Sequence, residues 1–95
     1  MRVFVMKVQL RANWVHSLKE KRMIVKSIIK RLQNTFNISA SEIEDQDLHQ
    51  KITIGICGIT LDSSQSDATR EKIINFIEDN TEAEIIGIEE NNEKY

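Results

Sequence analysis

Segments with two different hydrophobic periods alternate along this chain, and their order restricts the fold more than any other feature. Residues 2–11 alternate with the two-residue period of a β-strand, which collects one fully apolar face: Phe4, Met6, Val8 and Leu10. The opposite face begins with Val3 and Val5 and then becomes polar, as in a partly solvated strand.

The segment after this strand repeats its apolar side chains every three to four residues, which is the period of a helix. Ser17 and Glu20 have the S-x-x-E spacing of a capping box, in which each side chain satisfies a free backbone N–H group. We therefore predict a helix from Ser17 to about Phe36, followed by Asn37 in the left-handed conformation that often ends helices. Its apolar stripe comprises Leu18, Ile24, Val25, Ile28, Ile29, Leu32 and Phe36.

The second half of the chain gives two further strands, another helix and a fourth strand. Strands are predicted over residues 38–44, 51–61 and 83–90, with a turn at 45–47 and a polar tail at 91–95. The second helix is expected to be capped by Ser64 with Asp67 and to end near Asn80. Cys57 lies among apolar residues in the third strand, where we expect a buried, unreactive thiol.

The predicted order is β-α-β-β-α-β, which is the ferredoxin-like pattern of the α+β class. Right-handed crossovers then place two helices on one face of a four-stranded antiparallel sheet, with the first and third strands in its centre. The 95 residues form one domain, 1–95. No segment is long and apolar enough for a membrane span, so we expect a cytoplasmic protein without membrane attachment.

Charge is divided unequally between the two halves of the chain. Residues 1–37 carry nine basic side chains and one acidic one, a net charge of +8, whereas residues 38–95 carry four basic and fourteen acidic ones, a net charge of −10. The total of −2 conceals this asymmetry, which favours a polyanionic partner for the basic half.

Six cations of the first helix are the candidate nucleic-acid-binding residues: Lys19, Lys21, Arg22, Lys26, Lys30 and Arg31. Helical spacing puts Lys19, Arg22, Lys26 and Lys30 in a row about 16 Å long beside the apolar stripe, and Lys21 and Arg31 would support it. Such a row suits successive phosphates and salt-sensitive binding. The alternative interpretation, a solvated face whose cations are neutralised by acids from elsewhere in the fold, remains open at this point.

Other groups of residues give weaker signals. The start of the helix, with Ser17, suits an anion, although the capping box already uses its N–H groups. Asp45, Asp47 and His49 alternate and could face one side as metal ligands, but a charged turn explains them more simply. Trp14 is expected to cover the edge of the core rather than to stack on a base.

The sequence contains no nucleotide-binding glycine loop and no nucleophile motif, so we predict no catalytic residues, no cofactor and no resident metal. The strands carry no aromatic pair on their open face, which argues against an RNA-recognition-motif type of binding.

Three segments resemble the bacterial YlxP-like family, a domain of unknown function numbered 503: residues 16–22 (HSLKEKR), 36–39 (FNIS) and 42–50 (EIEDQDLHQ). The resemblance implies a small cytosolic protein with a ferredoxin-like fold. Genes of this family often lie near those of translation factors and a ribosome-maturation factor, which implies a role near the ribosome. His49 stands where many members carry an aromatic residue such as Trp. The family supplies no catalytic residues.

Two functions follow as hypotheses. The first is a non-enzymatic domain that binds RNA or a ribosomal particle through the first helix, by shape rather than by base identity. The second is a protein-interaction or homodimerisation module that uses the open sheet face or the acidic hairpin around residues 42–49.

Overall fold

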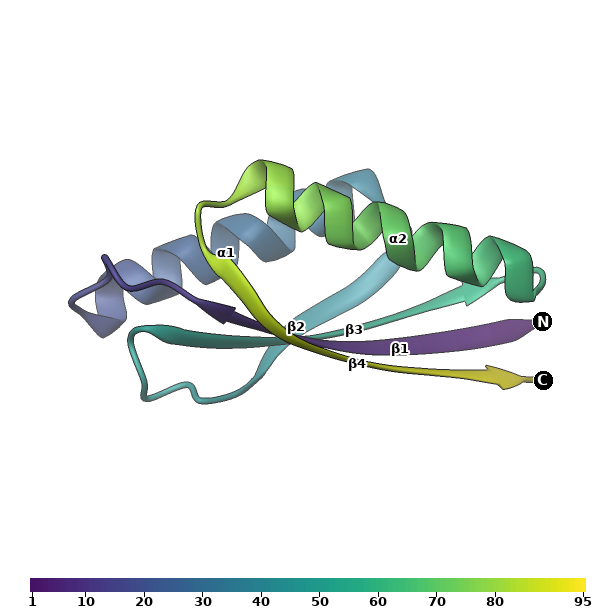
Figure 1. The fold of residues 1–95 in the computed structure, drawn as a ribbon, viewed down its shortest axis with the longest axis horizontal. Helices are drawn as coiled ribbons and strands as arrows, with labels where there is room; N and C mark the ends of the chain where they lie inside the picture. The colour runs from purple at the N-terminus through teal and green to yellow at the C-terminus, as the bar shows by residue number, and fades with distance from the viewer.

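The computed structural model describes residues 1–95 and has the predicted α+β, ferredoxin-like order of elements. These are β1 (Arg2–Arg11), α1 (Leu18–Thr35), β2 (Ile38–Glu44), β3 (Lys51–Thr60), α2 (Ser63–Asn80) and β4 (Glu84–Lys94). The strands form one antiparallel sheet in the order β2-β3-β1-β4, so β1 and β3 are central as predicted. Figure 1 shows both helices on one face of this sheet, while the other face is uncovered.

The core lies between the helices and the apolar face of β1. All four residues of that predicted face, Phe4, Met6, Val8 and Leu10, are buried. They pack with a cluster from β3 and both helices that includes Ile52, Ile54, Ile56, Val25, Ile28, Leu32, Ile73 and Ile77. Gly58 in β3 leaves room for the ring of Phe4, because a Cβ atom there would lie 2.7 Å from it.

Both helix starts are capped by side chains, but only one as predicted. The Oγ atom of Ser17 accepts a hydrogen bond from the Glu20 N–H at 3.1 Å, and Glu20 reaches back to the N–H of His16 at 3.5 Å. The second helix is capped by Asp62, which accepts from the Gln65 N–H at 2.8 Å, so the predicted cap at Ser64 was wrong.

The end of α1 also differs from the prediction. The helix stops at Thr35, and Phe36 is already extended with φ −121°. Asp45 is the residue with a positive φ, at 60°, so the left-handed conformation predicted for Asn37 was wrong.

The predicted polar tail at 91–95 belongs mostly to β4. Asn91 pairs with Val5, Glu93 with Val3, and the strand continues to Lys94. Backbone hydrogen bonds pair this end of the edge strand with β1, and they do not require apolar side chains. The polar sequence of residues 91–94 therefore gave no sign of a strand.

One predicted burial was wrong. Cys57 is exposed, because it points to the uncovered side of the sheet opposite the core residue Ile56. Trp14, which was expected to cover the core edge, is 41% exposed and lines a depression with Ile24 and Ile28 of α1, and its neighbour Val15 is fully buried. Neither helix combines the length and apolar character that crossing a bilayer would need.

Candidate nucleic-acid interface

Helix α1 presents four cations to solvent in one line, which we call the basic row: Lys19, Arg22, Lys26 and Lys30. All four are exposed, and none has a carboxylate within 4.0 Å, since the ion pairs of the structure use Lys7, Lys21, Lys51 and Arg70. The row spans about 16 Å along the helix. The alternative of a row neutralised by acids from elsewhere in the fold is therefore not what the structure contains.

A groove between α1 and β2 runs beside the basic row. It encloses about 460 Å³ and is lined by Arg22, Val25, Lys26, Ile29, Lys30, Gln33, Asn34 and Glu42. The apolar part of this lining is Val25 and Ile29, and the polar part comprises three cations, two amides and the carboxylate of Glu42. Such a surface can hold an anionic chain by charge and donate further hydrogen bonds to its oxygen atoms.

Lys21 was predicted to support the row, and the structure corrects this prediction. Its side chain is 1% exposed, with the Nζ atom 2.8 Å from Oε2 of Glu42, and it donates a hydrogen bond at 2.5 Å to the backbone oxygen of Asp45. It therefore joins the first turns of α1 to the β2–β3 turn and is out of reach of a phosphate.

The spacing of the apolar residues in α1 indicates that Lys21 is buried. Lys21, Val25, Ile28 and Leu32 are the buried residues of α1, and their spacing of four, three and four places Lys21 in the apolar stripe. A lysine in that position must bring its ammonium group to a partner, because an unpaired buried charge is costly.

Arg31 also lies apart from the row. Its Nη1 atom donates to the backbone oxygen of Asn80 at 3.3 Å, at the end of α2. It shares a depression with Trp14 and Met23 on another flank of α1. Of the six predicted residues, the structure thus groups four, while Arg31 is exposed elsewhere and Lys21 is buried.

Asp45, at the start of the β2–β3 turn, is held by two side chains of β3. Oδ2 of Asp45 accepts a hydrogen bond from Oγ1 of Thr53 at 2.9 Å and lies 3.5 Å from the Nζ atom of Lys51. The Thr53 hydroxyl, and then the positive charge of Lys51, lower the pKa of Asp45. Asp47 and His49 are exposed, and the structure contains no group of three His, Cys, Asp or Glu side chains arranged to hold a metal ion.

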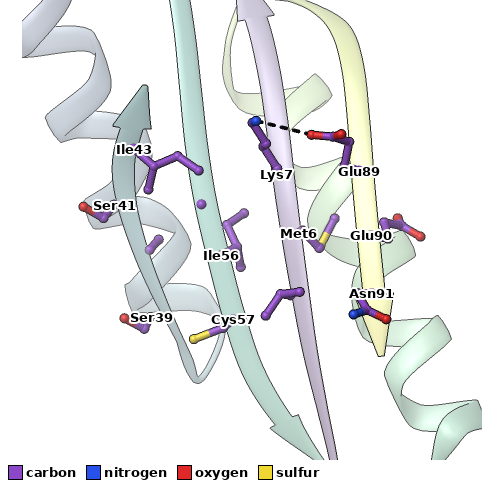
Figure 2. A pocket seen from close by; sticks show the side chains of 13 residues that line it. Met6, Lys7, Ser39, Ser41, Ile43, Ile56, Cys57, Glu89, Glu90 and Asn91 are labelled. Atoms are coloured by element: carbon purple, nitrogen blue, oxygen red, sulfur yellow. Dashed lines mark ion pairs between the residues drawn. The ribbon is translucent and has the colours of Figure 1, made fainter. Parts of the chain in front are cut away.

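The uncovered face of the sheet is apolar around β3 and β1. Val5, Ile43 and Ile59 are 45%, 46% and 69% exposed. Beside them the Lys7 ammonium group pairs with Glu44 at 2.7 Å and with Glu89 at 3.4 Å, the second pair being visible in Figure 2. The hydrogen bond to Glu44, together with Glu89, raises the pKa of Lys7.

The chain matches, over residues 3–90, the model of the family described as "Protein of unknown function (DUF503)". The chain belongs to the DUF503 family. It is similar to the "Uncharacterized protein YlxP" of Bacillus subtilis (strain 168), with 40% identity over 68 residues, which are 72% of this chain and 74% of that protein. The YlxP-like resemblance of the sequence is thereby confirmed.

In this DUF503 protein, the matched region contains the whole of α1, with the basic row and the buried Lys21 alike. Neither the family description nor the name of the relative assigns an activity.

Proposed function

We propose that this protein binds RNA, free or within a ribosomal particle, through the phosphate backbone and the basic row of α1. The observation that carries the proposal is that four aligned cations are exposed and have no ion-pair partner. The role is one of binding without catalysis, in the cytoplasm.

The electrostatics of the chain favour one orientation of a polyanion. The net charge is −2, so RNA is not attracted to the molecule as a whole. Six of the thirteen basic side chains lie on α1, whereas most acids of the second half of the chain lie in β2, the turn, α2 and β4. A polyanion would therefore approach with its backbone toward α1.

The groove suits recognition of backbone and shape rather than of bases. Three cations of the row line it, and Gln33 and Asn34 offer amide groups that can bond to phosphate or 2′-hydroxyl oxygens. No aromatic side chain lines it, so bases have no stacking platform there.

The test is a titration of labelled single-stranded RNA by fluorescence anisotropy at several salt concentrations. Four phosphate contacts give a slope of log K against log salt of about −2.8. The triple variant Arg22→Gln, Lys26→Gln, Lys30→Gln removes three contacts and should weaken binding about a hundredfold at about 0.1 M salt.

The matched control replaces two exposed cations outside α1, in the double variant Lys72→Gln, Lys94→Gln. This control should bind RNA like the unaltered protein. Equal losses in both variants, or an unchanged affinity in the triple variant, would exclude the basic row as the binding surface. Co-sedimentation with ribosomes, with and without nuclease, then separates free RNA from a ribosomal particle as the partner.

A second candidate function is protein interaction through the uncovered sheet face, where the exposed apolar side chains of Val5, Ile43 and Ile59 gather. The acidic hairpin is the less suitable of the two predicted surfaces. Glu44 and Asp45 already pair with Lys7 and Lys51, which leaves little free negative charge for a basic partner.

A further inference from the structure

The single tryptophan of the chain lines a depression on the flank of α1 that lies next to the end of α2. Trp14 comes from the segment before α1 and is 41% exposed, and Met23 of α1 is 67% exposed. The lining also includes Ser27, Arg31 and Glu82, and the enclosed volume is about 310 Å³. Figure 1 shows the end of α2 and the turn that follows it beside α1, so this Trp14 depression is bounded by three parts of the chain.

The charges around the Trp14 depression differ from those of the basic row. Its lining contains one cation, Arg31, and one carboxylate, that of Glu82. The carboxylate repels a phosphate group, whereas the exposed apolar surface of Trp14 and Met23 favours an uncharged ligand. A nucleobase is such a ligand, because it is uncharged and flat and stacks on aromatic rings.

Arg31 is held in place in the lining of this depression. Its Nη1 atom donates a hydrogen bond to the backbone oxygen of Asn80 at 3.3 Å, which ties the guanidinium group to the end of α2. The guanidinium group has further N–H donors for the ring nitrogens and carbonyl oxygens of a base, and its plane is a second stacking surface. The Glu82 carboxylate can accept hydrogen bonds from base amino groups. The depression therefore offers stacking, donors and an acceptor to one uncharged ring.

The depression lies within the reach of one nucleotide from the basic row. The α1 residues Met23, Ser27 and Arg31 each directly follow a cation of that row, so each is turned by 100° about the helix axis at nearly the same height. On a helix about 11 Å across, this rotation corresponds to about 10 Å along the surface. A nucleotide spans a comparable distance from its phosphate to the far edge of its base. A strand whose phosphates follow the basic row can therefore turn a base into the depression.

We propose that Trp14 and Arg31 hold an unpaired nucleobase of the RNA strand whose phosphates bind to the basic row. The ligand is then single-stranded RNA, because bases inside a duplex are not available for stacking on a side chain. Stacking accepts every base, so the contact adds affinity without reading the sequence. This inference rests on the RNA binding proposed for the basic row.

The test uses the fluorescence of Trp14, which reports on this depression alone because the chain has no other tryptophan. Single-stranded oligouridine should quench this fluorescence, whereas an abasic strand of the same length and charge should bind to the basic row without quenching it. Trp14→Leu should weaken the binding of labelled oligouridine about tenfold, and Trp14→Phe should restore most of the affinity. Neither variant should change the slope of log K against log salt, because the phosphate contacts remain.

The matched control is Tyr95→Leu, because Tyr95 is 69% exposed but lies beyond the end of β4. It should bind oligouridine like the unaltered protein, and circular dichroism checks that all variants are folded. Equal quenching by both strands, or no quenching by either, overturns the base contact, and so does full affinity in Trp14→Leu. RNA binding that still depends on Arg22, Lys26 and Lys30 would then leave the proposed function intact. If the triple variant of these three cations binds RNA normally, the proposed function fails and the base contact fails with it.

Discussion

Helices α1 and α2 have the same length, 18 residues each, and cover the same face of the sheet, yet their charges are opposite. The first carries six cations and one acid, the second two cations and four acids. In α2, Arg70 is 15% exposed and contacts both Asp67 and Glu90, whereas the basic row of α1 has no ionic partner. Packing on this sheet therefore does not require a positive helix, and the charge of the basic row is not explained by the fold.

The exception within α1 is Lys21, the one buried cation of that helix. Its contacts with Glu42 and with the backbone oxygen of Asp45 connect α1 to β2 and to the following turn. The comparison thus separates the cations of one helix into Lys21, which is buried and ion-paired, Arg31, which contacts the end of α2, and the four exposed cations of the basic row, which have no ionic partner.

The largest expected effect is the loss of this buried cation. Lys21→Met leaves the carboxylate of Glu42 without its partner and should lower the free energy of unfolding by about 3–5 kcal/mol in urea titrations. The double variant Lys21→Met, Glu42→Leu removes both charges and should recover most of that loss.

Lys26→Met, on the exposed side of the same helix, is the control and should change the free energy of unfolding by less than about 0.5 kcal/mol. If Lys21→Met and Lys26→Met have equal effects, the distinction between buried and exposed cations of α1 does not hold.

A smaller effect concerns the turn that anchors α1. Thr53→Val removes the hydroxyl that lowers the pKa of Asp45, so that pKa should rise toward its ordinary value. A carboxylate with a lowered folded-state pKa contributes stability above its unfolded pKa and loses it as the pH falls through the folded pKa. The variant should therefore be less stable than the unaltered protein at neutral pH, and the difference should shrink in acid.

Thr60→Val provides the matched control, because the Thr60 hydroxyl donates to the uncharged backbone oxygen of Asp62 at 3.2 Å. The effect of Thr60→Val on the free energy of unfolding should be the same at neutral and at acid pH. A Thr53→Val effect that is also independent of pH would mean that the hydroxyl does not act through the Asp45 carboxylate.

The smallest expected effect is on stability when the basic row is neutralised. Like charges four residues apart repel, and both Arg22 with Lys26 and Lys26 with Lys30 have this spacing. The triple variant Arg22→Gln, Lys26→Gln, Lys30→Gln should therefore be as stable as the unaltered chain, or more stable by a few tenths of a kcal/mol. A midpoint in urea clearly below that of the unaltered protein would show that these cations stabilise the fold after all.

The fold could be predicted from the sequence where side chains carry a periodic signal. The alternation in β1 and the stripe of α1 gave these two elements and their core residues, and weaker patterns in the second half of the chain gave the other four elements. The last four residues of β4 were missed because their pairing with β1 depends on backbone hydrogen bonds, which leave no trace in side-chain polarity. Cys57 was expected to be buried because its neighbours in β3 are apolar, but the burial of its face depends on which side of the sheet the helices cover.

The candidate site was predictable only in part, for a similar reason. Spacing along one helix placed the basic row correctly, since that row is a local property of α1. The partners of Lys21 lie 21 and 24 residues further along the chain, and the contact of Arg31 is with Asn80. No local pattern gives such long-range contacts, although the position of Lys21 in the apolar stripe indicated its burial.

The place of the basic row beside β2 has a consequence for solubility. β2 is an edge strand of seven residues, so its outer backbone groups are open to pairing with a strand of another molecule. Charged side chains near such an edge, together with the irregular register between Glu42 and Glu44, discourage an added strand. The cations proposed to bind RNA thus also disfavour edge-to-edge aggregation through β2.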